Sequence, residues 1–387
     1  MPRPSDRQKQ EKNIMKAIAI FPVEKKVQLI DHPEPVIQTP TEIKLKILEV
    51  GVCGTDREIS SFKYGTPPSG SDYLVIGHES LGTVVEIGKG VKRFKKGDLV
   101  VLMVRRPCLH PDCKACKARR PDFCITGDFR ERGIKGLHGF MTEYVVDDEK
   151  YMNPVPKELR EVAILTEPLT IAEKALQEVW NIQRRLPWMT TEAQEKKQMS
   201  GFKAVVLGAG PVGLLGTMVL RDAGFRTYGY SIEPSGSEKA KVVSAMGAAY
   251  LSAQDHSFED LVKITGNIDI IYEATGASKF SFDVMPYLGT NGIFVFTGIP
   301  GIKAKVEIDA DTIMKNMVLK NQVIFGTVNA GQSAFESAIR DLDAFYKCWP
   351  AVLKAMITKR CEPESFSQIL QGPSEGIKNV ITFDKTK

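Results

Sequence analysis

Long apolar runs are missing from this 387-residue chain, and no stretch reaches the roughly 20 residues that a membrane-spanning helix needs. An excess of one charge is missing too, because 52 Lys and Arg residues face 47 Asp and Glu residues. The net charge of +5 is too small and too dispersed to indicate a nucleic-acid partner. The basic opening segment has no apolar core of a secretory signal. We therefore expect a flexible tail over residues 1–14, no membrane partner and a cytoplasmic location.

Cysteine is sparse and unevenly distributed. The chain has seven cysteines, an odd number, and four of them lie within residues 108–124. A disulfide framework would spread pairs over a small secreted chain, whereas clustering in a large intracellular chain indicates a metal site. Internal repeats and low-complexity tracts are also absent, so we expect no repeat architecture.

What the sequence does contain is a change of pattern near its middle. A chain of this length exceeds the size at which single cores stop growing, so two domains are expected. Residues 16–20 and 42–50 alternate apolar with polar side chains, as half-buried strands do. Frequent Gly and Pro residues punctuate this part of the chain. The pattern predicts a β-rich, barrel-like domain over residues 15–185, with a helix over residues 167–179.

Strands and helices alternate in the second half. Strands are expected over residues 203–207, 227–230, 269–273, 292–296 and 323–327, and helices over residues 214–222 and 238–246. This alternation specifies a parallel, doubly wound sheet of the Rossmann type, which we place over residues 186–330. The remainder, residues 331–387, has a long amphipathic helix from Ala334 and a strand over residues 377–383. We expect this segment to return to the first domain.

A glycine pattern joins the expected strand over residues 203–207 to the next helix. It consists of Gly208, Gly210, Pro211, Val212 and Gly213. The first glycine allows the tight turn, the second leaves room for a pyrophosphate, and the third lets the helix pack closely on the strand. The phosphates would then meet free N–H groups at the positive end of a helix. This context predicts a dinucleotide-binding site.

The end of the second Rossmann strand bears on the choice between NAD and NADP. An NAD enzyme usually carries an acidic residue there for the ribose 2′-hydroxyl. Ser231 stands near the expected place and Glu233 just beyond it, and no Arg is present to bind a 2′-phosphate. We favour NAD and leave the use of both cofactors open. The alternative for Glu233 is an ordinary solvated loop residue.

Four cysteines in one loop provide a set of soft ligands: Cys108, Cys113, Cys116 and Cys124. A tetrahedral structural zinc needs such a set. His110 lies inside the first gap and could replace Cys108 as the fourth ligand. This zinc would brace the loop and take no part in the chemistry.

A second ligand set lies upstream, where Cys53 is followed by the pair His78 and Glu79. A catalytic zinc has about three protein ligands and a position left open for water or substrate. Alone, a cysteine on a strand is more often a small core residue. Together, and upstream of the cysteine loop and the glycine pattern, the three residues predict a catalytic zinc. The expected content is two zinc ions per chain.

The order of these motifs resembles the zinc-containing medium-chain alcohol dehydrogenase superfamily, over about residues 15–383. Within it, the chain is most similar to the archaeal-type glucose 1-dehydrogenases. The closer signals lie at residues 104–108, 120–129, 136–141, 165–169 and 325–329. The resemblance implies a GroES-like β-rich catalytic domain beside the Rossmann domain. It also implies oxidation of the anomeric hydroxyl of an aldose, D-glucose to gluconolactone, by a nicotinamide cofactor.

The resemblance also implies roles for single residues. Glu167 would ligate the catalytic zinc or replace its water, although an acidic residue there could simply stabilise a helix start. Thr55 would hydrogen-bond the reacting hydroxyl and begin a proton relay, or else cap a turn. Glu131 and Asn329 would bind sugar hydroxyls, or else be ordinary surface groups.

Departures from the family pattern loosen the assignment to glucose. Val104 and Ile171 stand where the family usually has polar groups, some members have Gln at position 167, and the first gap of the cysteine loop is longer than usual. Alternatives are therefore a polyol or amino-alcohol dehydrogenase, with a sugar or other alcohol as its small-molecule partner, or a nucleotide-binding protein without catalysis. We expect a homodimer or homotetramer.

Overall fold

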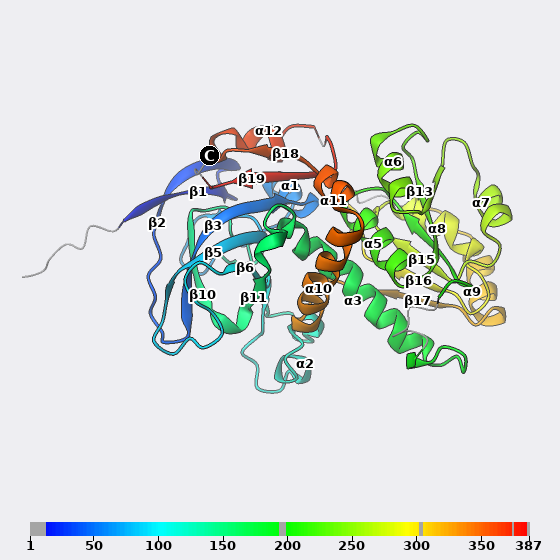
Figure 1. Cartoon of the computed structure of the whole chain (residues 1–387), viewed down its shortest axis with the longest axis horizontal. Coiled ribbons are helices and arrows are strands. Elements are labelled where there is room, and N and C mark those ends of the chain that lie inside the picture. The colour runs from blue at the N-terminus through cyan, green and yellow to red at the C-terminus, as the bar shows by residue number, and fades with distance from the viewer. Residues whose placement is uncertain (1–12, 193–198, 302–304, 374, 385–387) are drawn as a thin grey trace, which may run out of the picture.

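The computed structural model describes residues 13–192, 199–301, 305–373 and 375–384. The expected tail lies outside this part up to residue 12, and the first strand begins at Ile14. Two bodies lie side by side, and the helices α3 (Thr166–Gln183) and α10 (Gln332–Cys348) lie between them (Figure 1). Within the described ranges, no helix is both long and apolar enough to cross a lipid bilayer.

The first body is built on a seven-stranded sheet in the order β11-β6-β5-β3-β19-β18, with β10 also paired to β3. Its strands are β3 (Glu42–Val52), β5 (Glu79–Ile87), β6 (Leu99–Leu102), β10 (Tyr144–Asp148), β11 (Met152–Val155), β18 (Ile357–Cys361) and β19 (Lys378–Thr382). The expected alternation is confirmed in β3, where Ile43, Leu45 and Ile47 are fully buried and the residues between them are partly exposed.

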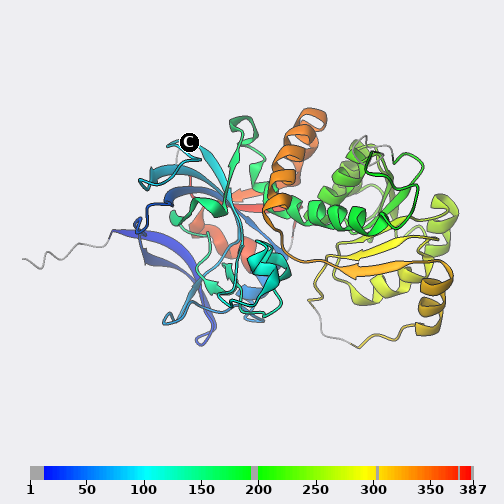
Figure 2. The same cartoon turned by 90° about the horizontal axis from the view of Figure 1, so that it is seen from below.

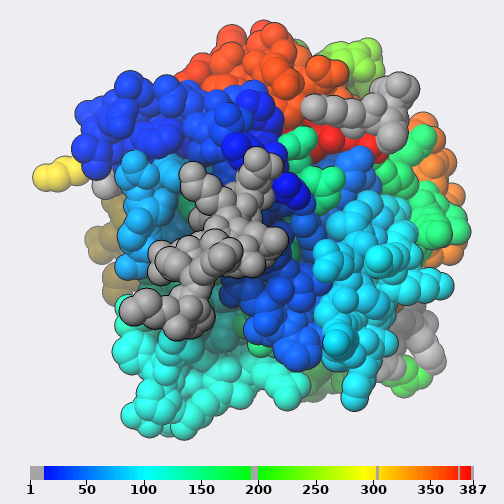
Figure 3. Space-filling model, turned by 90° about the vertical axis from the view of Figure 1, so that its left-hand side faces the viewer, coloured from blue at the N-terminus to red at the C-terminus, as the bar shows by residue number. Residues whose placement is uncertain are grey.

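Two small sheets and several short helices complete this body. The strands are β1 (Ile14–Phe21), β2 (Lys26–Pro33), β4 (Leu74–Val75), β7 (Arg105–Arg106), β8 (Arg130–Arg132) and β9 (Gly136–Leu137), and the helices are α1 (Gly54–Ser60), α2 (Lys114–Lys117), α11 (Pro350–Met356) and α12 (Phe366–Leu370). Because β19 pairs with β3, the C-terminal segment belongs to the first sheet. In Figure 3 its orange and red residues lie against the blue N-terminal strands.

The second body is a six-stranded, all-parallel sheet in the order β14-β13-β12-β15-β16-β17. Its strands are β12 (Lys203–Leu207), β13 (Arg226–Ser231), β14 (Ala249–Ser252), β15 (Ile270–Glu273), β16 (Ile293–Phe296) and β17 (Val323–Gly326). The strand order reverses between β12 and β15, and ligands of such sheets bind at that switch point. The predicted α/β class, with its doubly wound parallel sheet, is confirmed.

Helices cover both faces of this sheet. They are α5 (Pro211–Asp222), α6 (Glu238–Ala245), α7 (Phe258–Thr265), α8 (Ser278–Val284) and α9 (Ala310–Leu319). Alternate residues of β12 enter two different cores: Ala204 and Val206 pack with α3, α5 and α6, whereas Val205 and Leu207 pack with α7 and α8. Figure 2 shows α3 running from the first body along the sheet, so this helix couples the two bodies.

Three helices begin earlier than expected. α3 runs over Thr166–Gln183, not over residues 167–179. α5 starts at Pro211, not at residue 214, because proline suits the first helical position and the glycine before it serves as N-cap. α10 starts at Gln332, not at residue 334. The short strand β14 was not foreseen.

Candidate active site

The glycine-rich turn after β12 has the shape that the phosphates of a dinucleotide require. Gly208 has a φ of +96°, a conformation that disfavours residues with a side chain. A Cβ on Gly213 would lie 2.2 Å from the Gly208 carbonyl oxygen, so helix and strand can pack this closely only with glycine there. At Gly210, by contrast, a Cβ would meet no atom within 4 Å, and the space is open. Since Gly210 is the N-cap of α5, the first N–H groups of that helix are free to receive an anion.

Glu233, the acidic residue just after the second Rossmann strand, already contacts two other side chains. The Ser231 hydroxyl, at the end of β13, donates to the Glu233 carboxylate, and Lys239 Nζ lies 2.5 Å from Glu233 Oε1. Burial opposes ionisation, but these two donors hold the pKa of Glu233 below its ordinary value. The sequence analysis missed Lys239 because it considered only Arg as a partner for a 2′-phosphate. The sequence feature that could have indicated this partner is a lysine in the first turn of the following helix.

Three potential metal ligands meet at the base of the cleft between the two bodies. Cys53 follows β3 and is the N-cap of α1, and His78 and Glu79 lie where the chain enters β5. The two strands are antiparallel neighbours, with Gly51 opposite Glu79, so their ends converge. The Cys53 sulfur, a ring nitrogen of His78 and a carboxylate oxygen of Glu79 all lie within 4.8 Å of one another.

Asp56 orients two of these ligands, a role that the sequence analysis missed. Its fully buried carboxylate accepts the Cys53 backbone N–H at 2.9 Å and lies 3.2 Å from His78 Nδ1. This contact leaves Nε2 of His78 for a metal ion, as in many carboxylate–histidine–zinc arrangements. Burial disfavours the charged imidazole, but Asp56 and Cys53 outweigh it and hold the pKa of His78 well above its ordinary value. Zinc binding would displace that proton.

A buried lysine from the C-terminal segment contacts Glu79. Lys378, the first residue of β19, donates to both carboxylate oxygens of Glu79 at 2.7 and 2.6 Å. Both side chains are nearly inaccessible to solvent. Gly51 makes room for the carboxylate, because a Cβ there would lie 2.1 Å from Glu79 Oε2. Glu79 can therefore ligate a metal only while sharing its oxygens with Lys378.

Glu167 lies beside this set, in the first turn of α3. Its side chain opens on the cavity, yet desolvation by the surrounding protein raises its pKa to about 7. The nearby charge of His78 lowers the pKa and that of Glu79 raises it, each to a smaller extent. The cluster of three close donor atoms does not include Glu167, so the structure places it next to the ligand set and leaves its role as a ligand a prediction.

The donors of this cleft fit a zinc ion. A thiol, an imidazole and carboxylates are the ligands that zinc takes in proteins. Asp56, Glu79 and Glu167 place three carboxyl groups around Cys53, and the cations that face them among the described residues are Lys378 and the protonated His78. With His78 neutral, as a metal ligand must be, these carboxyl groups outnumber Lys378, and the buried negative charge needs a counter-cation. A dication at this position would supply it.

The ligand set opens into a cavity of about 630 Å³ between the two bodies. Thr55, Glu131 and Asn329 line it together with the ligand set. Val212, after the glycine turn, lines it from the Rossmann side. The structure thus brings the predicted substrate residues into one cavity with the predicted zinc ligands, while their individual roles stay predictions.

Glu131 and Asn329 contact each other inside this cavity. Asn329 Nδ2 donates to Glu131 Oε1 at 2.9 Å, and Arg105 Nε donates to the same oxygen at 2.9 Å. The Arg105 guanidinium also stacks on Phe129, with its central carbon 3.7 Å from the ring centroid. Arg105 is a cavity residue that the sequence analysis did not single out. The second oxygen of Glu131 is the part of the carboxylate left for a substrate hydroxyl.

Other cavity walls are hydroxylic or apolar. The Tyr64 hydroxyl hydrogen-bonds Thr55, and burial raises the pKa of Tyr64 to about 12, so it stays a hydrogen-bond donor near neutral pH. Val104, Ile171 and Ile299 give the cavity an apolar side. Val104 and Ile171, the two positions at which the sequence has apolar in place of polar groups, thus both line the cavity.

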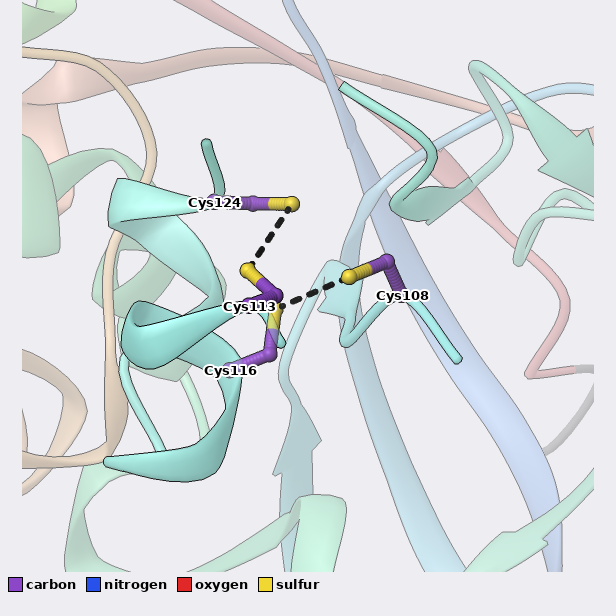
Figure 4. Close-up of side chains that lie close together, drawn as sticks. All are labelled: Cys108, Cys113, Cys116 and Cys124. Carbon is purple, nitrogen blue, oxygen red and sulfur yellow. Dashed lines mark hydrogen bonds between the residues drawn. The ribbon is translucent and has the colours of Figure 1, made fainter. Parts of the chain in front are cut away.

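The four cysteines of the loop around α2 point toward a common centre (Figure 4). Cys108 Sγ lies 3.6 Å from Cys116 Sγ, and Cys113 Sγ lies 3.9 Å from Cys124 Sγ. A tetrahedron with Zn–S bonds of about 2.3 Å has edges of about 3.8 Å, whereas a disulfide would need about 2.05 Å. The geometry fits a structural zinc site.

The alternative fourth ligand, His110, does not join this group. Its Nε2 pairs with Asp128, and its ring is half exposed. The close donor group consists of the four sulfurs, with Cys108 among them. The geometry thus favours Cys108 over His110.

Family comparisons agree with this architecture. Residues 39–157 match the alcohol dehydrogenase GroES-like domain, and residues 160–383 match the glucose dehydrogenase C-terminus. The glucose 1-dehydrogenase of Methanocella arvoryzae is 38% identical over 370 residues, which are 95% of this chain and 99% of that protein. The glucose 1-dehydrogenase of Thermoproteus tenax is 37% identical over 369 residues, again 95% of this chain and 99% of that protein.

Solved structures give the same result. Glucose dehydrogenase of Haloferax mediterranei, solved in complex with NADP, Zn and gluconolactone, superposes with a TM-score of 0.83 at 31% identity and covers 96% of this chain and 100% of that chain. 2R,3R-butanediol dehydrogenase of Bacillus subtilis shares the fold, with a TM-score of 0.76 at 23% identity, covering 96% of this chain and 100% of that chain.

A GroES-like domain, a Rossmann sheet and two zinc-ligand sets define the zinc-containing medium-chain dehydrogenases. Within that class, the chain belongs to the glucose 1-dehydrogenase family. The predicted superfamily, subfamily and fold class are thereby confirmed.

The two ligand sets predict different failures for two cysteine variants. Cys53→Ser removes a ligand from an open catalytic site, so we expect turnover to fall on the order of 1,000-fold or more while melting temperature and cofactor binding persist. Cys116→Ser removes a ligand of a structural ion, which contributes folding free energy directly. That variant should melt at least about 5 °C lower and keep most of its initial rate at low temperature.

The measurement is a melting temperature beside a low-temperature initial rate for each variant. An active Cys53→Ser variant contradicts the catalytic assignment. A Cys116→Ser variant that is inactive yet as stable as the wild type contradicts the structural one.

Proposed function

We propose that this enzyme oxidises the anomeric hydroxyl of an aldose, D-glucose to gluconolactone, with zinc and a nicotinamide cofactor. The observation that carries the proposal is the Glu131–Asn329 pair, two sugar-type hydrogen-bonding groups that share a cavity with Cys53, His78 and Glu79. The full-length relatives named glucose 1-dehydrogenase support it. So does the Haloferax mediterranei enzyme in complex with NADP, Zn and gluconolactone.

Cys53, His78 and Glu79 would hold the catalytic zinc, with Glu167 ligating it or replacing its water. When bound, zinc supplies a Lewis acid, which brings the pKa of a coordinated hydroxyl toward about 7. Thr55 accepts the hydrogen bond of the reacting hydroxyl and passes its proton outward, with Tyr64 as the next hydroxyl in reach. Cys108, Cys113, Cys116 and Cys124 would hold the structural zinc.

The glycine turn and the adenosine end of the Rossmann sheet would hold the cofactor. Gly210 leaves room for the pyrophosphate, Gly208 allows the turn and Gly213 lets helix and strand pack closely, with Pro211 and Val212 at the start of the helix. Val212, at the switch point of the sheet, would lie beside the nicotinamide, which when bound would supply the hydride acceptor. Ser231 and Glu233 face the adenosine ribose, and we favour NAD because the Glu233 carboxylate repels a 2′-phosphate. Lys239 offsets part of that repulsion, so NADP is the second cofactor.

The apolar side of the cavity supports one alternative substrate class. Val104 and Ile171 offer no hydrogen bonds to a ring hydroxyl, which suits a polyol or amino alcohol with fewer polar groups on that side. The Glu131–Asn329 pair matches neighbouring hydroxyls of either an aldose or a polyol, and the relatives named glucose 1-dehydrogenase favour the aldose.

We place the enzyme in the cytoplasm as a homodimer that could pair further into a homotetramer. β17 is an edge strand of the Rossmann sheet, with its outer N–H and C=O groups free for another strand. The adjoining helix α9 has no buried residue and exposes Met314, Val318 and Leu319 by 66–75%. A second copy, related by a two-fold axis, could extend the sheet and cover these side chains. Sedimentation equilibrium should give twice or four times the chain mass, and a monomer would contradict this proposal.

A substrate and cofactor screen tests the proposed function. D-Glucose, other aldoses, sorbitol and an amino alcohol are each offered with NAD and with NADP, and kcat/KM is compared. We expect D-glucose to give the highest value, with NAD ahead of NADP. A polyol or amino alcohol with the highest value overturns the aldose assignment and supports the alternative.

Two charge variants in the same screen test the cofactor site. Glu233→Arg should shift the ratio of NADP to NAD activity upward by at least about tenfold, because a 2′-phosphate gains a charge-assisted bond in place of repulsion. Lys239→Met should shift the ratio the other way, because it leaves Glu233 without its counter-charge. Ratios unchanged in both variants would show that Glu233 does not face the adenosine ribose.

A further inference from the structure

A buried lysine beneath the cavity joins three segments of the chain. Lys174 on α3 is 2% exposed, and its Nζ lies 2.9 Å from Asp122 Oδ2. The same nitrogen donates to the Val328 carbonyl oxygen at 2.9 Å and lies 4.3 Å from the centroid of the Phe123 ring. One cation thus ties the helix that begins beside Glu167 to the cysteine loop and to the loop after β17.

Asp122 provides the cysteine-loop end of this contact. It stands between Cys116 and Cys124, and its side chain is fully buried. Arg120 Nη2 also donates to its carboxylate, at 2.8 Å. The packing toward the loop after β17 is close, because a Cβ on Gly331 would lie 3.1 Å from Asp122 Oδ1. A displacement of the cysteine loop would therefore shift the loop after β17.

Both residues proposed to bind the sugar are attached to this arrangement. Asn329 directly follows Val328, and its φ of +59° lies in the left-handed region, which asparagine adopts more readily than most residues. Glu131 is held by Arg105, whose Nη1 also donates to the Asp122 carbonyl oxygen at 3.3 Å. Asp122 thus supports Asn329 through Lys174 and the Val328 carbonyl, and it supports Glu131 through Arg105.

We infer that Lys174 and Asp122 are positioning residues for the sugar, and that the structural-zinc loop sets substrate affinity through this ion pair. Neither side chain lines the cavity. They act by fixing the Val328 carbonyl and the Asp122 backbone, and so the separation of Asn329 from Glu131. The inference rests on the proposed function, because it takes those two residues as the sugar's ligands.

A purely structural role for the pair predicts a different outcome. Removing one partner of a buried ion pair leaves the other uncompensated and costs stability wherever the pair lies. Such a loss lowers the amount of folded enzyme and leaves the KM of every substrate unchanged. A positioning role changes the KM for the sugar and spares the KM for the cofactor, since the glycine turn has no contact with the pair among the described interactions.

The experiment compares Lys174→Met with Lys174→Met/Asp122→Asn. The methionine keeps the apolar stem of Lys174 and removes its donor. We expect the single variant to raise the KM for the sugar about tenfold while the cofactor KM stays within about twofold, because small misplacements of binding groups are costly. The double variant also takes the Asp122 charge away from Arg120, which pairs with it in the single variant, so its melting temperature should not rise above that of the single variant. Its sugar KM should stay raised, because the Val328 carbonyl still lacks its donor.

Lys347→Met is the matched control. That lysine forms an exposed pair with Asp343 on α10, at 2.6 Å, far from the cavity lining, and its loss should leave every KM unchanged. A sugar KM unchanged in both Lys174 variants overturns the inference. If the wild type prefers a polyol, the proposed function is wrong but the inference is still tested, because the KM for that polyol then reports on the positioning role. An Asn329→Ala variant, measured in parallel, raises the sugar KM if Asn329 is a ligand, whatever Lys174 does.

Discussion

Negative charge concentrated at the base of the cleft is the constraint on which the rest of the site depends. Asp56, Glu79 and Glu167 bring three carboxyl groups to the surroundings of Cys53 and His78 in a desolvated pocket, where the protonated His78 is one of the cations that face them. Lys378 neutralises part of this charge. A low-dielectric environment makes the remaining charge costly, and it also strengthens the attraction for a dication. Desolvation in this pocket raises the pKa of Glu167 to about 7, and the charges of His78 and Glu79 change it to a smaller extent and in opposite directions.

The fold meets this constraint by bringing distant strands together. The ends of β3 and β5 carry the ligands, and β19 pairs with β3 to bring in the one lysine that contacts Glu79. α3 then links the ligand set to the Rossmann sheet, because Glu167 stands in its first turn and its later turns share a core with β12. A helix common to both halves keeps the metal site and the cofactor turn in register, which hydride transfer between two bound partners requires.

The ligand residues could be predicted from the sequence because each set is local: a short spacing of thiols, or an imidazole next to a carboxylate, carries its own chemistry. Lys378 could not, because it lies 299 residues from Glu79 and meets it only through strand pairing. Lys174 was equally hidden, since a lysine inside an amphipathic helix gives no sign that it is buried against Asp122. Lys239 was near enough in sequence to be found, but a helical turn had to be placed first. The doubly wound sheet was predictable from alternating patterns, whereas the short strand β14, the helices α7, α8 and α9 and the starts of the predicted helices were missed.

The zinc content of the undamaged purified protein tests the central claim most directly. Two separate donor sets, one with four sulfurs and one with a thiol, an imidazole and a carboxylate, could each hold one zinc ion. Elemental analysis against protein concentration should therefore find two zinc ions per chain, of which the catalytic one is more readily removed by a chelator because its site is open. One zinc ion or none, in protein that is folded and has its seven cysteines unoxidised, would contradict the account for at least one of the two sets.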